Sequence, residues 1–294
     1  MNSVFWQGKR VFITGHTGFK GAWLCFWLYH LGAKVCGYAL PPTVSQTLFD
    51  DLRLSEYIHS SFDDVTDRDQ LMSALIDCQA DIVIHLAAQP LVQKSFNDPY
   101  ETFNTNVMGT VNVLEAIRKC ETVRSCVIVT TDKCYQNNEW IWPYRETDRL
   151  GGDDPYSSSK ACAELLTHSY NKSFFSNSHA CKHSCAVATA RAGNVIGGGD
   201  WAGDRLIPDL VRSLQKNERL SLRNPKATRP WQFVMEPLRG YLMLAEKLYE
   251  VGQDYIGGWN FGPRSDEIRS VEWVVDHFFD ALNRPKHWHV TNNT

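Results

Sequence analysis

Short apolar runs alternate with longer amphipathic segments over the first two thirds of the chain. Short apolar runs between turn residues are typical of buried strands, and longer segments with apolar side chains every three or four residues are typical of helices. We therefore expect a regular alternation of strands and helices. The expected strands are residues 10–14, 35–40, 57–62, 81–86, 126–131 and 186–191, and the expected helices are residues 19–31, 68–76, 99–119 and 155–175.

This alternation predicts the class of fold. Strands that return to one sheet through helices run parallel, and helices then cover both faces of that sheet. We expect a doubly wound parallel sheet of the Rossmann-like α/β class, which would form a dinucleotide-binding domain over residues 1–192. The pattern loosens afterwards, and residues 193–294 are expected to form a smaller substrate-binding region. Its expected helices are residues 208–216, 236–251 and 271–282.

Composition excludes several classes of protein. Among the 294 residues, 43% are hydrophobic and 21% are charged, which is typical of a globular protein and not of a disordered or collagen-like chain. The formal net charge of −3 provides no bulk attraction to nucleic acid or to an anionic membrane, so we expect neither as a partner. The most membrane-like stretch, between Lys20 and Lys34, is shorter than the roughly 20 apolar residues of a spanning helix.

The first residues of the chain and its cysteines indicate in which cellular compartment the protein is located. The N-terminal segment has no long apolar core and no cleavage site of a signal peptide, and the nine cysteines are an odd number. We therefore expect a reducing, cytoplasmic location. The segment 179–185 has potential metal ligands at alternate positions: His179, Cys181, His183 and Cys185. However, no second pair of ligands at the spacing of a zinc site accompanies them. We expect a polar loop there, and no metal site.

A glycine motif follows the first expected strand directly and opens the first expected helix. Its glycines are Gly15, Gly18 and Gly21, with Thr17 and Phe19 between them. Glycine lets the backbone turn tightly and approach a pyrophosphate, which free N–H groups and the positive end of the helix dipole can bind. We expect this loop to bind a dinucleotide.

The end of the second expected strand does not choose between NAD and NADP. Leu40-Pro41-Pro42 stands where an acidic residue would bind the ribose 2′-OH of NAD, and no arginine follows at once to bind a 2′-phosphate. After the third strand, Asp64 and Val65 could bracket an adenine, Asp64 at its amino group and Val65 through its backbone. Alternatively, Asp64 and Asp67 form an N-cap cluster of the next helix.

Tyr156 and Lys160 form a Y-x-x-x-K motif on an expected helix. The spacing of four residues places both side chains on one face. A nearby ammonium and a cationic nicotinamide ring would both favour the phenolate, which lowers the pKa of the tyrosine. Tyr156 could then take a proton from a substrate hydroxyl while hydride leaves for the cofactor.

With these motifs the chain resembles the extended short-chain dehydrogenase/reductase family. The segment 86–90 is similar to its turn after strand four, and the segment 104–110 to its fourth-helix motif, in which the structural asparagine corresponds to Asn106. Within that family, the chain resembles the CDP-glucose 4,6-dehydratases. The segments that carry this closer resemblance are residues 130–135, 191–201 and 223–232.

The resemblance implies an NAD-dependent lyase that acts on CDP-glucose or a related nucleotide sugar. Oxidation at C4 acidifies the C5 proton, loss of that proton and of the C6 hydroxyl gives an enone, and hydride returns to C6. The product would be CDP-4-keto-6-deoxy-D-glucose, used in deoxysugar and O-antigen polysaccharide biosynthesis.

The residues suit this chemistry. Tyr156 would be the base at O4, Lys160 its electrostatic partner, and Thr131 a hydrogen-bond donor to O4. Asp132, kept protonated by burial, would donate to the leaving C6 hydroxyl. Lys133 would act at C5, as base or as stabiliser of the enolate. The alternative for Asp132 and Lys133 is a solvated turn pair.

Further site residues follow from the resemblance alone. Arg229 would reach the diphosphate, for which a guanidinium is suited. The other expected contacts are Leu86, Ala87 and Ala88 with the cofactor, and Gln89, Asn194, Arg205 and Leu206 with the substrate.

Several alternatives stay open. The chain could be another nucleotide-sugar 4,6-dehydratase, a 4-epimerase, or a catalytically silent dinucleotide-binding scaffold. Inverting UDP-sugar dehydratases also carry Thr-Asp-Lys, but their active-site tyrosine lies much closer to it than Tyr156, which follows Asp132 by 24 residues. Phe233 replaces a usual histidine, and similar proteins continue beyond His289, so we expect an incomplete C-terminal region. By the same resemblance we expect a homo-oligomer, a dimer or tetramer, through the helices at 99–119 and 155–175.

Overall fold

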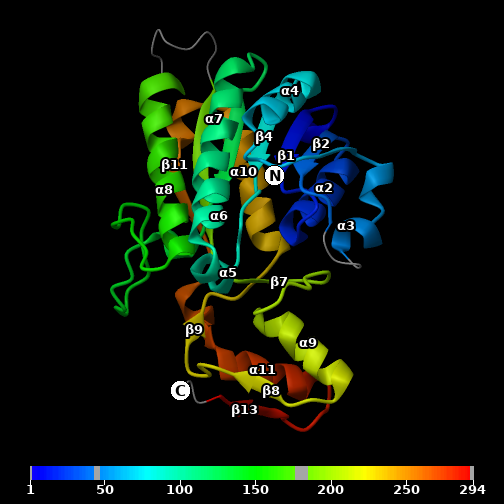
Figure 1. The fold of residues 1–294 in the computed structure, drawn as a ribbon, viewed down its shortest axis with the longest axis vertical. Helices are drawn as coiled ribbons and strands as arrows, with labels where there is room; N and C mark the ends of the chain where they lie inside the picture. Colours follow the sequence, from blue (N-terminus) through cyan, green and yellow to red (C-terminus); the bar gives the residue numbers. More distant parts are fainter. Residues whose placement is uncertain (1, 43–46, 176–184, 292–294) are drawn as a thin grey trace. The chain divides into compact units, whose positions relative to one another are not determined.

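The computed structural model describes residues 2–42, 47–175 and 185–291, and the chain divides into two compact units (Figure 1). The first unit contains Met1–Ala192 and Met235–Phe261, and the second contains Gly193–Val234 and Gly262–Thr294. The first unit therefore extends beyond the expected residues 1–192, because a later helix and strand return to it. Of the segment 179–185, where we expect a polar loop and no metal site, the structure describes Cys185 alone.

A parallel sheet of seven strands forms the centre of the first unit, in the order β11-β6-β5-β4-β1-β2-β3. All six strand pairings are parallel, which confirms the expected doubly wound class. The central strands are buried along their lengths, as a sheet covered on both faces requires. The strands are β1 (Arg10–Thr14), β2 (Lys34–Ala39), β3 (His59–Phe62), β4 (Ile82–His85), β5 (Ser125–Val129), β6 (Ala186–Ala192) and β11 (Gly257–Phe261).

Helices cover this sheet, as Figure 1 shows for α4, α7 and α8. One buried cluster joins α4 and α7 to the strands, through side chains such as Leu71, Leu114 and Ile128. On α2 the fully buried apolar side chains are Ala22, Leu24, Cys25 and Leu28. The helices of this unit include α2 (Phe19–His30), α4 (Arg68–Cys78), α5 (Val92–Asn97), α6 (Pro99–Phe103), α7 (Gly109–Lys119), α8 (Pro155–Tyr170) and α10 (Met235–Glu250).

Two features of this unit differ from the sequence prediction. The helix expected over 99–119 is interrupted by a π-helical turn, Asn104–Met108, between α6 and α7. The strand β11 was not expected at all. It pairs with β6 and places Gly258 against the buried side chain of Arg191, which leaves no room for a Cβ atom.

The second unit has a small core of its own. Leu210, Leu220, Leu222, Val275 and Phe279 form this core. Its strands pair in three two-stranded sheets, β10 with β7, β12 with β9, and β13 with β8. The elements are β7 (Val195–Ile196), α9 (Leu206–Lys216), β8 (Leu220–Leu222), β9 (Thr228–Arg229), β10 (Gln232–Phe233), β12 (Arg269–Ser270), α11 (Val271–Ala281) and β13 (Trp288–Val290). Over the described ranges, we find no helix with the length and apolarity that crossing a bilayer requires.

Candidate cofactor and catalytic site

The glycine loop between β1 and α2 has the backbone that its sequence predicts. Gly15 has a φ of +77°, which favours glycine, and a Cβ atom on it would lie 2.7 Å from the backbone nitrogen of Ala87. A Cβ atom on Gly21 would lie 2.0 Å from the carbonyl oxygen of Gly15. Gly18 is the N-cap of α2 and has no side chain to cap the free N–H groups. These features leave a helix N-terminus open to an anion, which fits the pyrophosphate of a dinucleotide.

The turn after β4 lies against this loop. The backbone N–H of Ala87 donates to Thr14 Oγ1 over 3.1 Å, and Leu86 N donates to the carbonyl oxygen of Thr14 over 3.1 Å. The expected cofactor residues Leu86 and Ala87 are therefore held beside Gly15 by the last residue of β1. Ala88 follows them in the same turn.

The opposite side of the loop is closed by the end of β2. Thr17 Oγ1 donates to the carbonyl oxygen of Leu40 over 3.0 Å. Beyond β3, Asp64 Oδ1 accepts from Thr66 N over 2.9 Å, so this aspartate forms a local turn. Val65 is buried and packs against Gly109, on which a Cβ atom would lie 2.8 Å from Val65 Cγ1. Asp64 and Val65 therefore both have a local structural role in the turn that follows β3.

Tyr156 and Lys160 lie on the first turns of α8, and both are buried. Asp154 caps this helix by accepting from Ser157 N over 2.9 Å. Lys160 Nζ donates to the carbonyl oxygen of Val129, the last residue of β5, over 3.1 Å. Burial lowers the pKa of Lys160 to about 8, although nearby Glu164 acts in the opposite direction. The ammonium therefore remains the major form at neutral pH.

Thr131, Asp132 and Lys133 follow β5 and contact one another. Lys133 Nζ forms an ion pair with Asp132 Oδ1 over 3.0 Å, and Thr131 Oγ1 donates to the same oxygen over 3.1 Å. The burial expected for Asp132 is not found, because 33% of its side-chain surface is exposed. In this arrangement Asp132 is an acceptor that orders its two neighbours.

The sequence prediction missed a buried ionic network next to Lys160. Glu164 Oε2 accepts from Arg191 Nη2 over 2.7 Å and from Thr189 Oγ1 over 2.6 Å. Its other oxygen accepts from Thr130 Oγ1 over 2.5 Å. The spacing of four residues between Lys160 and Glu164 was the available signal, because it places both on one helix face.

Gln89 has a different environment from the one expected of a substrate contact. It is buried, and its side-chain amide donates to Thr102 Oγ1 over 2.9 Å and accepts from Leu91 N over 2.7 Å. Its backbone N–H donates to Asn106 Oδ1 over 2.8 Å. These contacts direct the polar groups of Gln89 into the protein.

The other expected substrate residues lie in the second unit. Arg205 precedes α9 and forms an ion pair with Asp200 over 3.0 Å, while Leu206 packs on the core of the unit. Asn194 has a buried Oδ1 atom with no hydrogen-bond partner among the described residues. Arg229 is exposed on β9 and pairs in register with Arg269 of β12, which brings two guanidinium-bearing residues together.

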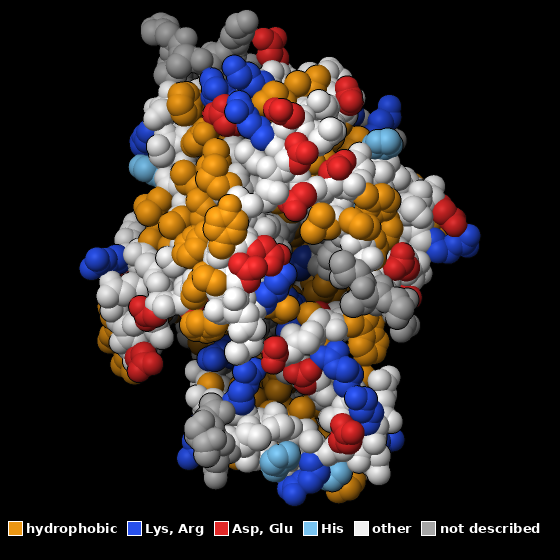
Figure 2. Space-filling view, viewed as in Figure 1, with side chains coloured by type: hydrophobic (Ala, Val, Ile, Leu, Met, Phe, Trp, Pro, Cys, Tyr) orange, Lys and Arg blue, Asp and Glu red, His pale blue; other side chains and the backbone are white. Residues whose placement is uncertain are grey.

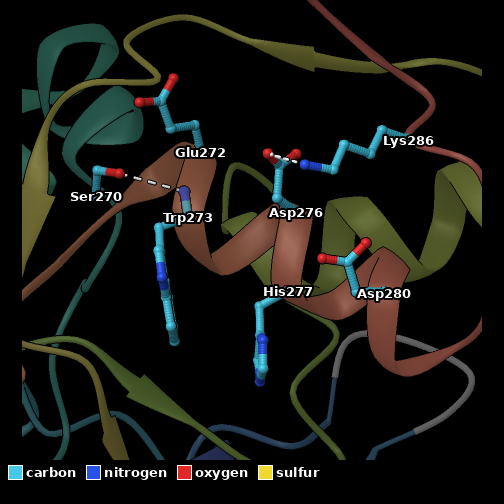
Figure 3. Close-up of a pocket in the computed structure, with 7 residues that line it drawn as sticks. All are labelled: Ser270, Glu272, Trp273, Asp276, His277, Asp280 and Lys286. Atoms are coloured by element: carbon cyan, nitrogen blue, oxygen red, sulfur yellow. Dashed lines mark hydrogen bonds and ion pairs between the residues drawn. The ribbon is translucent and has the colours of Figure 1, made fainter.

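Two open pockets lie on the second unit. One, of about 350 Å³, is lined by the glycine-rich segment 196–201 and by side chains of Ile207, Pro208, Val211 and Phe233. The other, of about 340 Å³, lies along α11 (Figure 3). There Asp276 points to Lys286, with which it forms an ion pair of 2.6 Å. We find no group of three or more potential metal ligands among the residues that the structure describes.

Comparison with known proteins identifies relatives over almost the whole chain. The GDP-mannose 4,6 dehydratase family matches residues 12–265. The chain is 50% identical to the CDP-glucose 4,6-dehydratase of Salmonella typhimurium over 284 residues, which are 97% of this chain and 79% of that protein.

Solved structures share the fold. The dTDP-glucose 4,6-dehydratase from Bacillus anthracis in complex with NAD superposes with a TM-score of 0.79 at 20% identity, covering 98% of this chain and 86% of that one. The UDP-glucose 4-epimerase from Thermotoga maritima with UDP-glucose gives a TM-score of 0.82 at 18% identity, covering 97% and 86%. These structural similarities establish the extended Rossmann-like fold.

Proposed function

The chain belongs to the GDP-mannose 4,6-dehydratase family, and we propose that it is a lyase that converts CDP-D-glucose to CDP-4-keto-6-deoxy-D-glucose. The observation that carries this proposal is the identity of half the aligned residues with a CDP-glucose 4,6-dehydratase, over nearly the full chain. The buried Tyr156 and Lys160 and the adjacent Asp132 and Lys133 provide the proton-handling groups that a dehydration needs.

NAD is the cofactor that we propose. The loop of Gly15 and Gly18 with the N-terminus of α2 would hold its pyrophosphate, and Tyr156 and Lys160 would lie at its nicotinamide end. When bound, this cofactor supplies a hydride acceptor for C4 and a hydride donor for C6. The fit rests on the helix N-terminus that Gly18 leaves uncapped and on the left-handed backbone of Gly15, which brings the loop against the backbone of Ala87.

The residues of the first unit would move the protons. Tyr156 would remove the proton from O4, and the ammonium of Lys160 would stabilise the resulting phenolate. Thr131 would donate a hydrogen bond to O4 in place of its present bond to Asp132. Asp132 and Lys133 form one ion pair, and transfer of a proton from the Lys133 ammonium to the Asp132 carboxylate would provide an acid and a base. Asp132 would then protonate the leaving C6 hydroxyl, and the neutral Lys133 would take the C5 proton, which restores the ion pair.

The second unit would bind the nucleotide. Arg229 and its register partner Arg269 provide positive charge for a diphosphate. The apolar cavity lined by Ile207, Pro208 and Phe233 has walls suited to a nucleoside. Asn194, Arg205 and Leu206 lie in the neighbouring segments, which supports a substrate role for this region.

We also propose that the protein forms a homo-oligomer through the surface of α5 to α8. Several large apolar side chains are exposed there, and Figure 2 shows hydrophobic side chains gathered over this part of the first unit. Replacement of Leu165, which is 58% exposed on α8, by glutamate would then reduce the sedimentation coefficient. The same change at Met243, which is 42% exposed on α10, is the matched control. The exposed apolar residues of the surface are Phe96, Tyr100, Phe103, Met108 and Leu165.

The proposed location is the cytoplasm, as the sequence predicts. The cysteines that the structure describes are all free thiols, which is consistent with a reducing compartment.

A substrate panel tests the activity. The purified protein is incubated with NAD and, in turn, CDP-glucose, dTDP-glucose, UDP-glucose and GDP-mannose, and the 4-keto-6-deoxy product is detected by mass spectrometry. We expect product from CDP-glucose. Product from another nucleotide sugar but not from CDP-glucose would refute the proposed substrate, and binding without turnover would indicate a silent scaffold.

A further inference from the structure

His85, the last residue of β4, is 1% exposed and has a hydrogen-bond partner on each side of its ring. Its Nδ1 atom lies 2.7 Å from Thr14 Oγ1, at the end of β1. Its Nε2 atom lies 3.3 Å from Thr110 Oγ1, on α7. The imidazole thus bridges the strand that leads into the cofactor loop and the helix that follows the π-helical turn.

The neighbouring bonds fix the tautomer of this ring. Thr110 Oγ1 donates its proton to the carbonyl oxygen of Asn106 over 2.7 Å, so it can only accept from His85. The proton of His85 must therefore be on Nε2, and Nδ1 accepts from Thr14. Thr14 Oγ1 in turn accepts from the N–H of Ala87.

The bonds continue from Asn106 to the catalytic helix. Asn106 Nδ2 donates to Ser159 Oγ over 2.9 Å and to the carbonyl oxygen of Gln89 over 3.1 Å. Ser159 Oγ donates to the carbonyl oxygen of Tyr156 over 2.7 Å. A continuous series of hydrogen bonds therefore joins Ala87 in the cofactor turn to the backbone of Tyr156, and His85 lies within it.

His85 remains in one charge state within this series. Burial lowers its pKa to about 3, and the positive charge of nearby Lys160 acts in the same direction. The neutral ring can therefore keep one acceptor and one donor at neutral pH, which a protonated imidazole could not do.

We propose that His85 is a positioning residue that aligns the cofactor turn at Ala87 with the catalytic helix at Tyr156. Each ring nitrogen makes the hydrogen bond on one side. Nδ1 accepts from Thr14, which binds the cofactor turn at Ala87, and Nε2 donates to Thr110, which binds the π-helical turn that contains Asn106. The proposal rests on the proposed function, since it assigns the two sides to cofactor and sugar chemistry.

Two substitutions by amide residues test the hydrogen bonds of Nδ1 and Nε2 one at a time. An asparagine amide at position 85 reaches the place of Nδ1, and a glutamine amide reaches the place of Nε2. We expect His85→Asn to keep the Kd for NAD within about twofold and to lower kcat by about tenfold, the effect of one lost hydrogen bond. We expect His85→Gln to raise the Kd for NAD by about tenfold with a smaller loss of kcat at saturating NAD.

A merely structural role predicts another result. Both variants would then lose thermal stability while kcat and the Kd for NAD stay within about twofold of the parent protein, and this outcome would overturn the proposal. Should either variant fail to fold, Thr110→Val and Thr110→Ser replace them. The valine variant should lose kcat, and the serine variant, which keeps the hydroxyl, should retain it; equal kcat in the two would also overturn the proposal.

The tautomer can be measured without any substrate. In the parent protein labelled with ¹⁵N-histidine, NMR should show His85 protonated on Nε2, identified by the loss of its signals in His85→Asn or, if that variant does not fold, by sequential assignment. A proton on Nδ1 would overturn the proposed arrangement. If the parent protein fails to convert any nucleotide sugar, the proposed function fails, whereas the tautomer and NAD affinity still test the positioning role.

Discussion

Glu164 lies one helical turn beyond Lys160 on α8, and its carboxylate raises the pKa of an ammonium whose pKa is lowered to about 8 by burial. That carboxylate accepts three hydrogen bonds, one from Thr130, which follows β5, and two from Thr189 and Arg191 of β6. The ionisation of Lys160 is therefore coupled to the packing of the central strands.

This coupling predicts a pH effect of Glu164→Gln. Loss of the carboxylate removes the group that favours the charged form of Lys160 and leaves Arg191 with a neutral partner, so both changes lower the pKa of Lys160. Because the protonated amine is the active form, the alkaline limb of kcat/KM should move to lower pH by about one unit. Steady-state rates between pH 6 and 10 measure this shift.

The matched control for that prediction is Glu246→Gln. Glu246 is also buried, and it accepts from the backbone nitrogen of Asn2 instead of contacting the network of Lys160. The alkaline limb of kcat/KM for the Glu246→Gln variant should coincide with that of the parent protein. An unmoved limb in folded Glu164→Gln would show that Glu164 has no influence on the catalytic lysine.

Tyr156→Phe should abolish turnover and leave NAD binding intact. The substitution removes only the phenol oxygen that we propose as the base, and the ring keeps its place on α8. We expect kcat to fall by at least about a hundredfold, in line with the loss of a general base. Calorimetric titration with NAD should give a Kd within a few-fold of the parent value.

Tyr170→Phe is the control on the same helix. Tyr170 OH donates to Glu115 over 3.0 Å, so its loss removes a hydroxyl from α8 without touching the proposed site. This variant should retain full kcat. A Tyr156→Phe variant that remains active would contradict the assignment of the base.

Gly15→Ala tests the cofactor loop. Both a left-handed backbone and a contact of 2.7 Å with Ala87 N oppose a side chain there. We expect the Kd for NAD to rise by at least about tenfold and the free energy of unfolding to fall by about 1–3 kcal/mol. Calorimetric titration and urea denaturation measure the two effects.

Gly8→Ala separates the effect of the left-handed backbone from the effect of the contact with Ala87. Gly8 has nearly the same φ, +74°, but no atom lies within 4 Å of a Cβ atom placed on it. This variant should show only the cost of the backbone, about 1 kcal/mol, with unchanged NAD binding. Equal losses in both variants would mean that the approach of Ala87 has no part in the cofactor site.

Local signals explain which features could be predicted from the sequence. The loop of Gly15, the Tyr156–Lys160 pair and the buried strands depend on residues close together in the chain, where spacing alone determines geometry. In contrast, β11 begins with two glycines, which have low strand propensity, and Gly258 is required because Arg191 fills the adjacent space. That requirement depends on a residue 67 positions away, so no local pattern could indicate it.

The direction of polar side chains in the site also could not be predicted from local sequence patterns. Gln89 was expected to face the substrate, but its amide is taken by Thr102 and Leu91. His85 belongs to a run of strand residues and gave no signal of its own, since its partners Thr14 and Thr110 come from two other elements. Side-chain direction at such positions follows from hydrogen bonds that form only once the fold has assembled.

A last prediction concerns the pair of His16 and Gly37, which lie on the cofactor loop and on β2. A Cβ atom on Gly37 would lie 2.3 Å from Cγ of the buried His16 ring, so Gly37→Ala should lower the free energy of unfolding by about 1–3 kcal/mol. His16→Ser frees that space, and in the double variant the alanine should cost far less. A double-mutant cycle by urea denaturation measures the coupling, and simple additivity of the two changes would contradict the packing described for this loop.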